Sequence, residues 1–487
     1  MSQKDERRVG MTGRTIGIRH RVKATAEGEA RPTQVFVLYD GTKKKKVLSL
    51  EDDNAELDFV TGRLPVSWRL VTHEDDLSKL PERHLRLKEL EAGVSPPEGT
   101  PDAWLKKVGK KVSVVSEVPD EYDGLREGDK VAMVLGGSGD RLAFALTNRG
   151  EKIGASVHRV PTFVFSSERK KVLAGDEGDE GVEGSAGGDG AAKKKKGKDN
   201  DAELLARLLT AKPEFFYAVR PRDRALIGVR ESLVTRIDAM KARIACEQRL
   251  RQSVIGRIFL SPEGNYPEGG VEEAFDLRKA NDTIFLNLSE EEKLAEKALV
   301  RACESLDVYQ QIFVPIEGCG PMTASRLISA IIDVRRFATK AKLKAFCGTH
   351  VLPDGRFPRR RAGSVANWHP DARQALYLLG VQFSKRPSSY WGQVLRRYKA
   401  SLRDKHPGEV VVEGRKLYTK GHIHNMATWS TLGKFVEALW TDWTNMENGR
   451  MPIPRVPQAP AGKDDLSASE VPEPVALEEG ELLSEAA

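Results

Sequence analysis

The segment from residue 174 to residue 200 most constrains how this chain can fold, because it cannot join a hydrophobic core. Its sequence, AGDEGDEGVEGSAGGDGAAKKKKGKDN, is rich in glycine and separates into an acidic block and a lysine block. Such a segment buries too little apolar surface to offset the entropy lost on ordering, so we expect a disordered linker. The chain of 487 residues is also too long for one typical core. We therefore expect a multidomain α+β protein.

Residues 1–173 show the pattern of a mixed α/β domain. Short β-rich runs separated by polar turns occupy residues 14–75 and again residues 111–165. In the second block, SGDRLAFALTNRG predicts a helix that ends at Gly150, and PTFVFSS predicts a further strand. The order strand, helix, strand predicts a βαβ unit and hence a mixed or parallel sheet.

From Asp201 onward the pattern becomes helical. Apolar residues recur at steps of three and four from Leu226 to Ile244, which predicts a long helix with one apolar face. Ser289 and Glu292 have capping-box spacing, so a second long helix is expected to begin there. Two such helices over residues 201–314 predict an antiparallel coiled-coil arm, and a pair of core helices is the alternative.

The remaining residues divide into a helical module and a tail. Four amphipathic or apolar runs between residues 315 and 447 predict a compact all-α module. Residues 448–487 have no periodicity and are expected to form a disordered acidic tail. The four cysteines never form CxxC, and no run of 18 apolar residues occurs. We expect no metal site, no cofactor, no membrane partner and a cytoplasmic location.

Charge is strongly segregated along the chain. Residues 335–405 hold 17 Lys or Arg but only three Asp, whereas residues 464–487 hold eight Asp or Glu and no base. A segment this basic indicates a polyanionic partner, and arginines interleaved with aromatic residues suit phosphates and stacked bases. The predicted RNA contacts are Arg356, Arg359, Arg360, Arg361, Ser364, Trp368, His369, Arg373, Lys385, Arg386, Tyr390, Arg396, Arg397 and Lys399. On the predicted arm, Arg236, Lys241 and Arg243 are further candidate contacts.

The turn PIEGCGPMTASRLI carries two glycines, Gly318 and Gly320, before a helix-starting Pro321. It matches neither the phosphate loop GxxxxGK[ST] nor the dinucleotide fingerprint. Two interpretations stay open. In the first, free N–H groups at the helix start face a nucleic-acid backbone. In the second, glycine only allows a tight turn between helices.

The same region resembles a known family. PIEGCGPMTASRLISAIIDVRRFATKAKLKAFCG, followed by ALYLLGVQF and GKFVEALWTDW, resembles the C-terminal module of the bridge-RNA-guided insertion-sequence transposases. Upstream, KVAMVLGGSGDRLAFALTNRGEKIGASVHRV is similar to part of the RuvC-like domain of that family. The resemblance covers about residues 14–445, and its C-terminal part is the most specific. The helical module also resembles the Nop domain of box C/D ribonucleoproteins and of the TIGR-associated (Tas) proteins.

The resemblance implies which residues should carry chemistry. The transposases use four carboxylates and a nucleophilic serine. Their first two acids fall at Arg19 and Gly136 of this chain, and the last pair falls near Lys198 and Asp201. The stretch GTHVLPDGRFPRRR, where the serine belongs, contains none, and Ser364 follows it. The resemblance therefore implies a degenerate RuvC-like domain without nuclease activity.

Three functions follow from this resemblance. The first is a nuclease-free, Tas-like protein that binds a guide RNA through its Nop-like module, pairs as a homodimer and directs the RNA to target DNA. The second is an active transposase with an unrecognised nucleophile such as Ser364. The third is an RNA scaffold protein of the box C/D kind.

Overall fold

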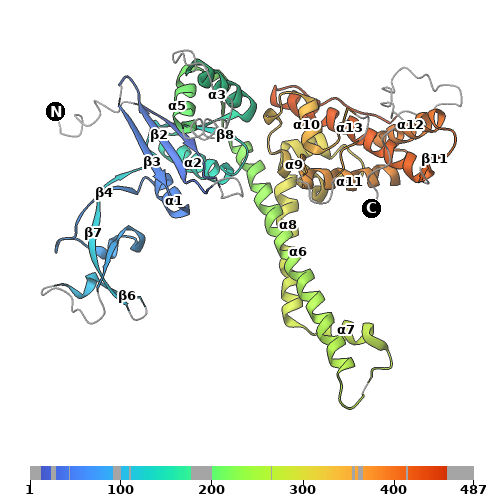
Figure 1. Ribbon diagram of the computed structural model, residues 1–487, viewed down its shortest axis with the longest axis horizontal. Coiled ribbons are helices and arrows are strands. Elements are labelled where there is room, and N and C mark those ends of the chain that lie inside the picture. The colour runs from blue at the N-terminus through green and yellow to red at the C-terminus, as the bar shows by residue number, and fades with distance from the viewer. Residues whose placement is uncertain are drawn as a thin grey trace, which may run out of the picture. The chain divides into compact units, whose positions relative to one another are not determined.

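The computed structural model describes most of the chain. The described residues are 13–22, 29–42, 44–90, 100–108, 111–176, 200–264, 266–353, 357–359, 366–412 and 415–457. The chain divides into two compact units, Met1–Arg220 and Pro221–Ala487, whose elements are labelled in Figure 1. The expected linker lies outside the described residues from 177 to 199. Within the described residues, no helix is long and apolar enough to cross a membrane.

The first unit is built on a six-stranded mixed sheet. Its strand order is β10-β9-β8-β1-β2-β3. β1 pairs antiparallel with β2, and β2 with β3, whereas β1, β8 and β9 run parallel. These strands are β1 (Arg14–Arg19), β2 (Thr33–Tyr39), β3 (Lys45–Leu50), β8 (Lys130–Leu135), β9 (Ser156–Pro161) and β10 (Tyr217–Ala218). The predicted mixed sheet is thus present, and the predicted helix, α2 (Asp140–Ile153), connects β8 to β9.

Helices cover both faces of this sheet. α1 (Asp53–Thr61) and α2 share one core with β1, β2, β3 and β8. α3 (Thr162–Asp176) and α5 (Asp201–Ala211) lie on apolar clusters with other residues of the sheet. α5 is so close to β1 that a Cβ on Gly17 would lie 1.9 Å from the carbonyl oxygen of Ala202.

Two expectations for this unit were wrong. PTFVFSS lies in α3 apart from its first residue, because Phe165 packs against α5 instead of joining the sheet edge. Residues 201–211 were expected in the arm, but α5 buries Leu205, Leu208 and Leu209 in the first unit. The sequence correctly predicted a helix at residues 201–211, but it did not show that the apolar face of this helix packs on the first sheet.

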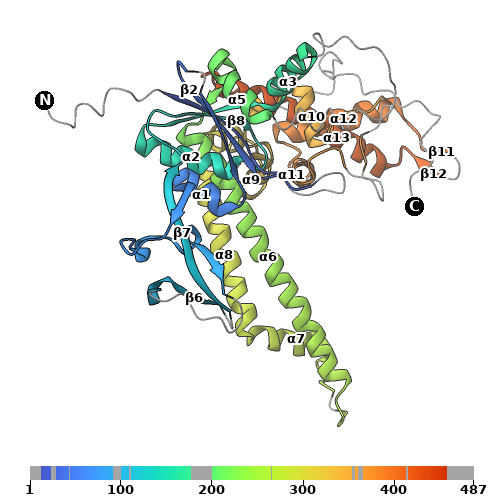
Figure 2. The same ribbon diagram turned by 60° about the vertical axis from the view of Figure 1, so that its left-hand side comes forward.

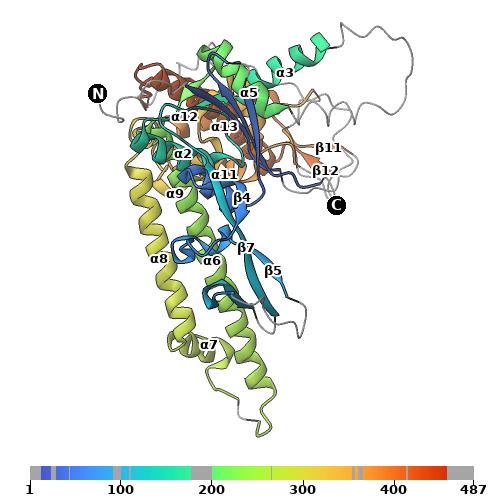
Figure 3. The ribbon, with the colours of Figure 1, turned by 90° about the vertical axis from the view of Figure 1, so that its left-hand side faces the viewer.

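A second, smaller sheet inserts between β3 and β8. Its order is β4-β7-β5, with β6 also paired to β7, and Figure 3 shows β4, β7 and β5 side by side. The strands are β4 (Leu64–Leu70), β5 (Arg86–Glu89), β6 (Leu105–Val108) and β7 (Lys111–Asp123). Its core is small and centres on Leu85, Val115 and Val118. The sequence indicated strands here but not a separate sheet.

A buried ion-pair network joins the two sheets. Arg14 at the start of β1 donates to Asp123 at 3.0 Å and to Asp129 at 2.6 Å. Burial alone would raise the pKa of Asp123, but hydrogen bonds from Lys46, the Gly124 N–H and Arg14 lower it to about 2. A buried charge is tolerated because it is paired in this way.

The second unit begins with a long helical hairpin. α6 (Pro221–Phe259) and α8 (Thr283–Glu304) run side by side, and α7 (Gly270–Ala280) lies at the far end (Figures 1 and 2). α8 begins six residues before Ser289, because Asp282 caps it by accepting from the Phe285 N–H at 2.9 Å. Ser289 lies inside the helix and donates to the Phe285 carbonyl oxygen at 2.7 Å.

Both interpretations of this helix pair describe part of it. The base of α6, with Leu226, Val229 and Leu233, is buried in the large core of the helical module together with Leu299 and Cys303 of α8. The far end has a separate small cluster with α7. The hairpin is therefore a core pair at one end and a protruding arm at the other.

The helical module packs around α13 (Lys420–Glu447). Its other helices are α9 (Pro321–Ile331), α10 (Lys340–Cys347), α11 (Pro370–Lys385) and α12 (Tyr390–Lys405), with a hairpin of β11 (Val410–Val412) and β12 (Arg415–Leu417). Trp391, Phe383 and Phe435 contact one another in the core, with ring centroids 5.3–5.9 Å apart. The start of the expected tail is held on α13, because the Ile453 N–H donates to Asp442 at 3.1 Å. Residues 458–487 lie outside the described residues.

Candidate nucleic-acid interface

The glycine turn before α9 closes a corner of the module. Gly318 has φ +86°, and a Cβ there would lie 2.8 Å from Nη1 of Arg386 and 2.9 Å from Cβ of Gln382. Both the left-handed backbone and the close packing against the end of α11 require glycine at this position. Gly320 has ordinary extended backbone, and a Cβ there would meet nothing within 4 Å. Packing therefore explains the glycine at position 318. At position 320 no side-chain contact requires glycine, and the space beside the start of α9 is open.

Arg386 is part of this corner. It ends α11, and its Nη1 donates to Oε1 of Gln382 at 2.5 Å while its backbone N–H donates to the Gln382 carbonyl oxygen at 3.1 Å. Arg386 is half-buried against Gly318. Lys385, the residue before it, is exposed.

α12 has one buried apolar face and carries cations on its other faces. Its buried face consists of Trp391, Val394, Leu395, Tyr398 and Leu402. Burial, together with the charge of Glu437, raises the pKa of Tyr398 to about 12, so this face stays neutral.

On the other faces of α12, Arg396 is exposed and Arg397 and Lys399 are half-buried. In the described part of the chain, these three side chains form no ion pair. Cations without an acidic partner are available to phosphates, and the RNA contacts predicted at these positions stay predictions.

Arg373 is held inside the module. Its guanidinium lies 4.8 Å from the ring centroid of Trp368 and 4.2 Å from that of Trp429. Nη1 donates to the Gly348 carbonyl oxygen, and Nη2 donates to that of Pro358 at 2.7 Å. Burial lowers the pKa of Arg373 below its ordinary value. With both terminal nitrogens bonded within the protein, Arg373 organises the fold, and its predicted RNA contact stays a prediction.

The aromatic candidates also have internal partners. The Trp368 ring stacks on Arg373, and His369 caps α11 by accepting the Ala372 N–H at 3.4 Å. The His369 ring lies 5.1 Å from the Phe346 ring, and burial lowers its pKa below the ordinary value. Tyr390 begins α12 and packs edge-on against Trp391 at 5.1 Å.

The arginine cluster before α11 is described only at Arg359, which is exposed. Arg356, Arg360, Arg361 and Ser364 lie outside the described residues. Their predicted RNA contacts stay predictions.

Two of the three arm candidates are bound within the arm. Arg243 pairs with Glu292 at 2.5 Å and with Glu247 at 2.8 Å. Arg236 lies 3.3 Å from Glu292 and 3.1 Å from Glu296. Because acids on α8 neutralise them, these arginines join α6 to α8, and their predicted nucleic-acid contacts stay predictions. Lys241 is exposed and has no ion pair in the described residues.

Lys340 and Lys342 were not singled out from the sequence. Both are exposed in the first turn of α10 and have no ion pair in the described residues. Cations at a helix N-terminus are unfavourable, because that end of the helix carries partial positive charge. The sequence signal that could have identified these residues is the position of two lysines just after the capping Thr339.

Arg19, Gly136 and Asp201 are the positions where the resemblance led us to look for the carboxylates of the transposases. Arg19 ends β1, and its Nη2 donates to the Pro32 carbonyl oxygen at 3.0 Å. Gly136 follows β8 with φ +86°. Asp201 starts α5 and lies 3.2 Å from Arg169. Within the described residues, no group of three or more His, Cys, Asp or Glu is placed to hold a metal ion.

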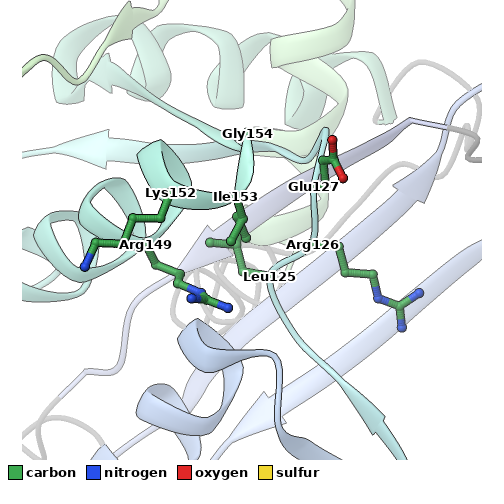
Figure 4. A pocket seen from close by; sticks show the side chains of 7 residues that line it. All are labelled: Leu125, Arg126, Glu127, Arg149, Lys152, Ile153 and Gly154. Carbon is green, nitrogen blue, oxygen red and sulfur yellow. The ribbon is translucent and has the colours of Figure 1, made fainter.

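An open hollow of about 610 Å³ lies beside α2. Arg126, Arg149 and Lys152 line it with Glu127. Figure 4 shows their charged ends pointing in different directions, so they do not converge on one anion.

A family model described as Transposase IS116/IS110/IS902 family matches residues 310–392. The match begins after α8 and covers the glycine turn, α9, α10, α11 and the start of α12. This part of the chain is therefore related to those transposases. No curated protein matches the chain.

Proposed function

We propose that the chain is a transposase-related protein that binds a structured guide RNA through α11 and α12, brings it to DNA and does not cut the DNA itself. The observation that carries the RNA-binding part is that Arg396, Arg397 and Lys399 on α12 form no ion pair with any residue that the structure describes. RNA helices are bound mostly through phosphates and 2′-hydroxyls, which suits cations on a helix surface. Base pairing by the RNA would then select the DNA.

The residues at the end of the first sheet support the absence of cleavage. The strand order, with β1 beside β2 and β3 on one side and beside parallel β8 and β9 on the other, supports a RuvC-like fold. In such a fold, two-metal cleavage needs carboxylates gathered at the strand ends. Arg19 and Gly136 occupy two of those positions, and Arg169 neutralises Asp201.

The far end of the hairpin supports a homodimer. Large apolar side chains are exposed there, including Phe259 at 69%, Leu260 at 81% and Ile284 at 67%. Exposed apolar surface on a monomer marks a contact with a partner, and a second copy of the arm offers the same surface. The helical module and its RNA contacts would then occur twice, in the manner of Nop-like and Tas proteins.

The test replaces Arg396 and Arg397 by Glu in the full-length protein. We expect the affinity for the co-purifying RNA to fall at least about tenfold, with a shallower salt dependence, because phosphate contacts are lost. The matched control is Arg149→Glu with Lys152→Glu on α2, which changes the charge equally and should leave affinity within about twofold. Fluorescence anisotropy over a salt series measures both.

The purified complex is also incubated with DNA complementary to the RNA and with Mg²⁺. Shifted, intact DNA supports the proposal. Cleaved or joined DNA would identify an active transposase instead, and RNA binding without DNA binding would identify a scaffold.

A further inference from the structure

A four-residue turn connects β8 to α2 in the first unit. Gly136 and Gly137 have φ +86° and +94°, values that favour glycine, and Ser138 and Gly139 follow. The turn folds back over the end of β1, since a Cβ on Gly139 would lie 3.2 Å from Cβ of His20. Ser138 is thus exposed on a sharp turn between a strand and a helix, the position that nucleophilic serines occupy in α/β hydrolases.

Ser138 ends a chain of polar contacts among three elements. Its Oγ lies 2.9 Å from Nδ1 of His20, which follows β1. The other ring nitrogen of His20, Nε2, lies 3.4 Å from Oε1 of Glu56 in α1. These residues are far apart in the sequence, so only the fold brings them together.

Glu56 is held in place behind the histidine. Thr33 donates to its Oε1 at 2.6 Å, and Arg21 donates to Oε2 at 3.2 Å. Burial would raise the pKa of Glu56, but the hydrogen bonds from His20 and Thr33 and the charge of Arg21 lower it below the ordinary value. Glu56 is therefore ionised at neutral pH.

An ionised carboxylate beside Nε2 favours the tautomer with its proton there. Nδ1 of His20 is then free to accept the Ser138 hydroxyl proton. The His20 side chain is only 14% exposed, so its ring is shielded while Ser138 faces solvent.

We propose that Ser138 is a catalytic nucleophile for carboxylic esters, with His20 as its base and Glu56 as the residue that positions the imidazole. His20 takes the hydroxyl proton while Oγ bonds to the ester carbonyl carbon. The ester C–O bond breaks, and the leaving alcohol takes that proton from His20. Water, deprotonated by His20, then releases the acid and restores Ser138. In this proposal, the N–H of Gly139, the residue after the nucleophile, donates a hydrogen bond to the oxyanion.

The same unit contains a natural control. Ser156 and His158 on β9 lie 2.9 Å apart through Oγ and Nε2. His158 has no ion pair with a carboxylate in the part of the chain that the structure describes. If a serine–histidine contact were sufficient, both serines would react. If the carboxylate is needed, only Ser138 would.

The experiment treats the full-length protein with a fluorophosphonate probe and locates the label by peptide mass spectrometry. We expect the label on Ser138, its loss in Ser138→Ala and no change in Ser156→Ala. His20→Gly should slow labelling at least about 100-fold, and added imidazole should restore part of the rate. Glu56→Gln should slow labelling at least about tenfold, with partial recovery in Glu56→Asp.

Hydrolysis of p-nitrophenyl acetate, measured on the same variants, should follow the labelling. Thermal melting identifies any variant that fails to fold, and Ser138→Ala, at an exposed site, should melt like the wild type. The proposal is overturned if Ser138 stays unlabelled, if Ser156 reacts as fast, or if imidazole does not rescue a folded His20→Gly protein.

Discussion

The arginines of α6 and those of α12 differ in what faces them. Arg236 and Arg243 on α6 point at Glu292 of α8, and their charge is used to hold two helices together. Arg396 and Arg397 on α12 have no ion pair in the described residues. A count of basic residues treats both pairs alike. The comparison shows that the neighbouring helix decides whether a cation is available to a nucleic acid.

Arg373→Ala should have the largest effect, because the half-buried Arg373 bonds within the same module that we propose binds RNA. The substitution removes two hydrogen bonds from a charged donor and leaves the carbonyls of Gly348 and Pro358 without that partner. We expect the free energy of unfolding to fall by about 3 kcal/mol in urea titrations. Affinity of the folded protein for RNA should change less than about twofold.

The exposed Arg396→Ala is the control, since its stability should stay within about 0.5 kcal/mol of the wild type. A stable Arg373→Ala protein that had lost RNA binding would show that the contacts of Arg373 are not structural. Internal hydrogen bonds would then not distinguish structural arginines from RNA-binding arginines, even within one module.

Arg243→Ala should have a smaller effect of the same kind. Arg243 and its partners are partly buried, so we expect about 1 kcal/mol of lost stability and unchanged RNA affinity. Lys241→Ala, on the same helix without an ion pair, should cost almost nothing. Urea titration and anisotropy measure the two quantities. If Arg243→Ala lowered the affinity for RNA without lowering the free energy of unfolding, Arg243 would be a nucleic-acid contact and the arm would belong to the interface.

Acid should reveal the smallest effect, at Glu247. Hydrogen bonding from Lys279, with further contributions from the charges of Lys279 and Arg243, lowers the pKa of Glu247 in the folded protein. The resulting stability is present above the unfolded pKa, about 4.3, and is lost as pH falls through the folded value.

The free energies of unfolding of wild type and Glu247→Gln should therefore converge as pH falls from 5 to 3. We expect a difference of a few tenths of a kcal/mol at pH 5, measured by urea titration at each pH. If the difference in the free energy of unfolding stayed constant from pH 5 to pH 3, the ion pairs of Glu247 would not contribute to the stability of the arm.

Several elements could be predicted from local pattern. The strands of the mixed sheet, α2 and the two long helices follow from periodicity of two or of three to four residues. The start of α8 was placed too late because Ser289 and Glu292 imitate a capping box, whereas Asp282 makes the cap hydrogen bond. α3 was misread because PTFVFSS has strand composition, and packing on α5 overrides that preference.

The candidate site was predicted less completely than the fold. The basic character of α12 and the glycine turn at Gly318 were visible in the sequence, but the sequence left open whether the turn packs within the module or faces a nucleic acid. The internal bonding of Arg373 and Arg243 was not, because their partners, Gly348, Pro358 and Glu292, are at least 10 residues away. The contact between Ser138 and His20 spans 118 residues and has no sequence signal.

By itself, the sequence determined the α+β character, the separation into a strand-rich and a helical part, and the basic surface of the last helices. These properties depend on composition and on short-range periodicity, which neighbouring residues set. The tertiary structure alone decided which unit α5 joins, which arginines are neutralised and which serine contacts a histidine. Those outcomes depend on side chains brought together across a sheet or between helices, and their energies arise only when the chain is folded.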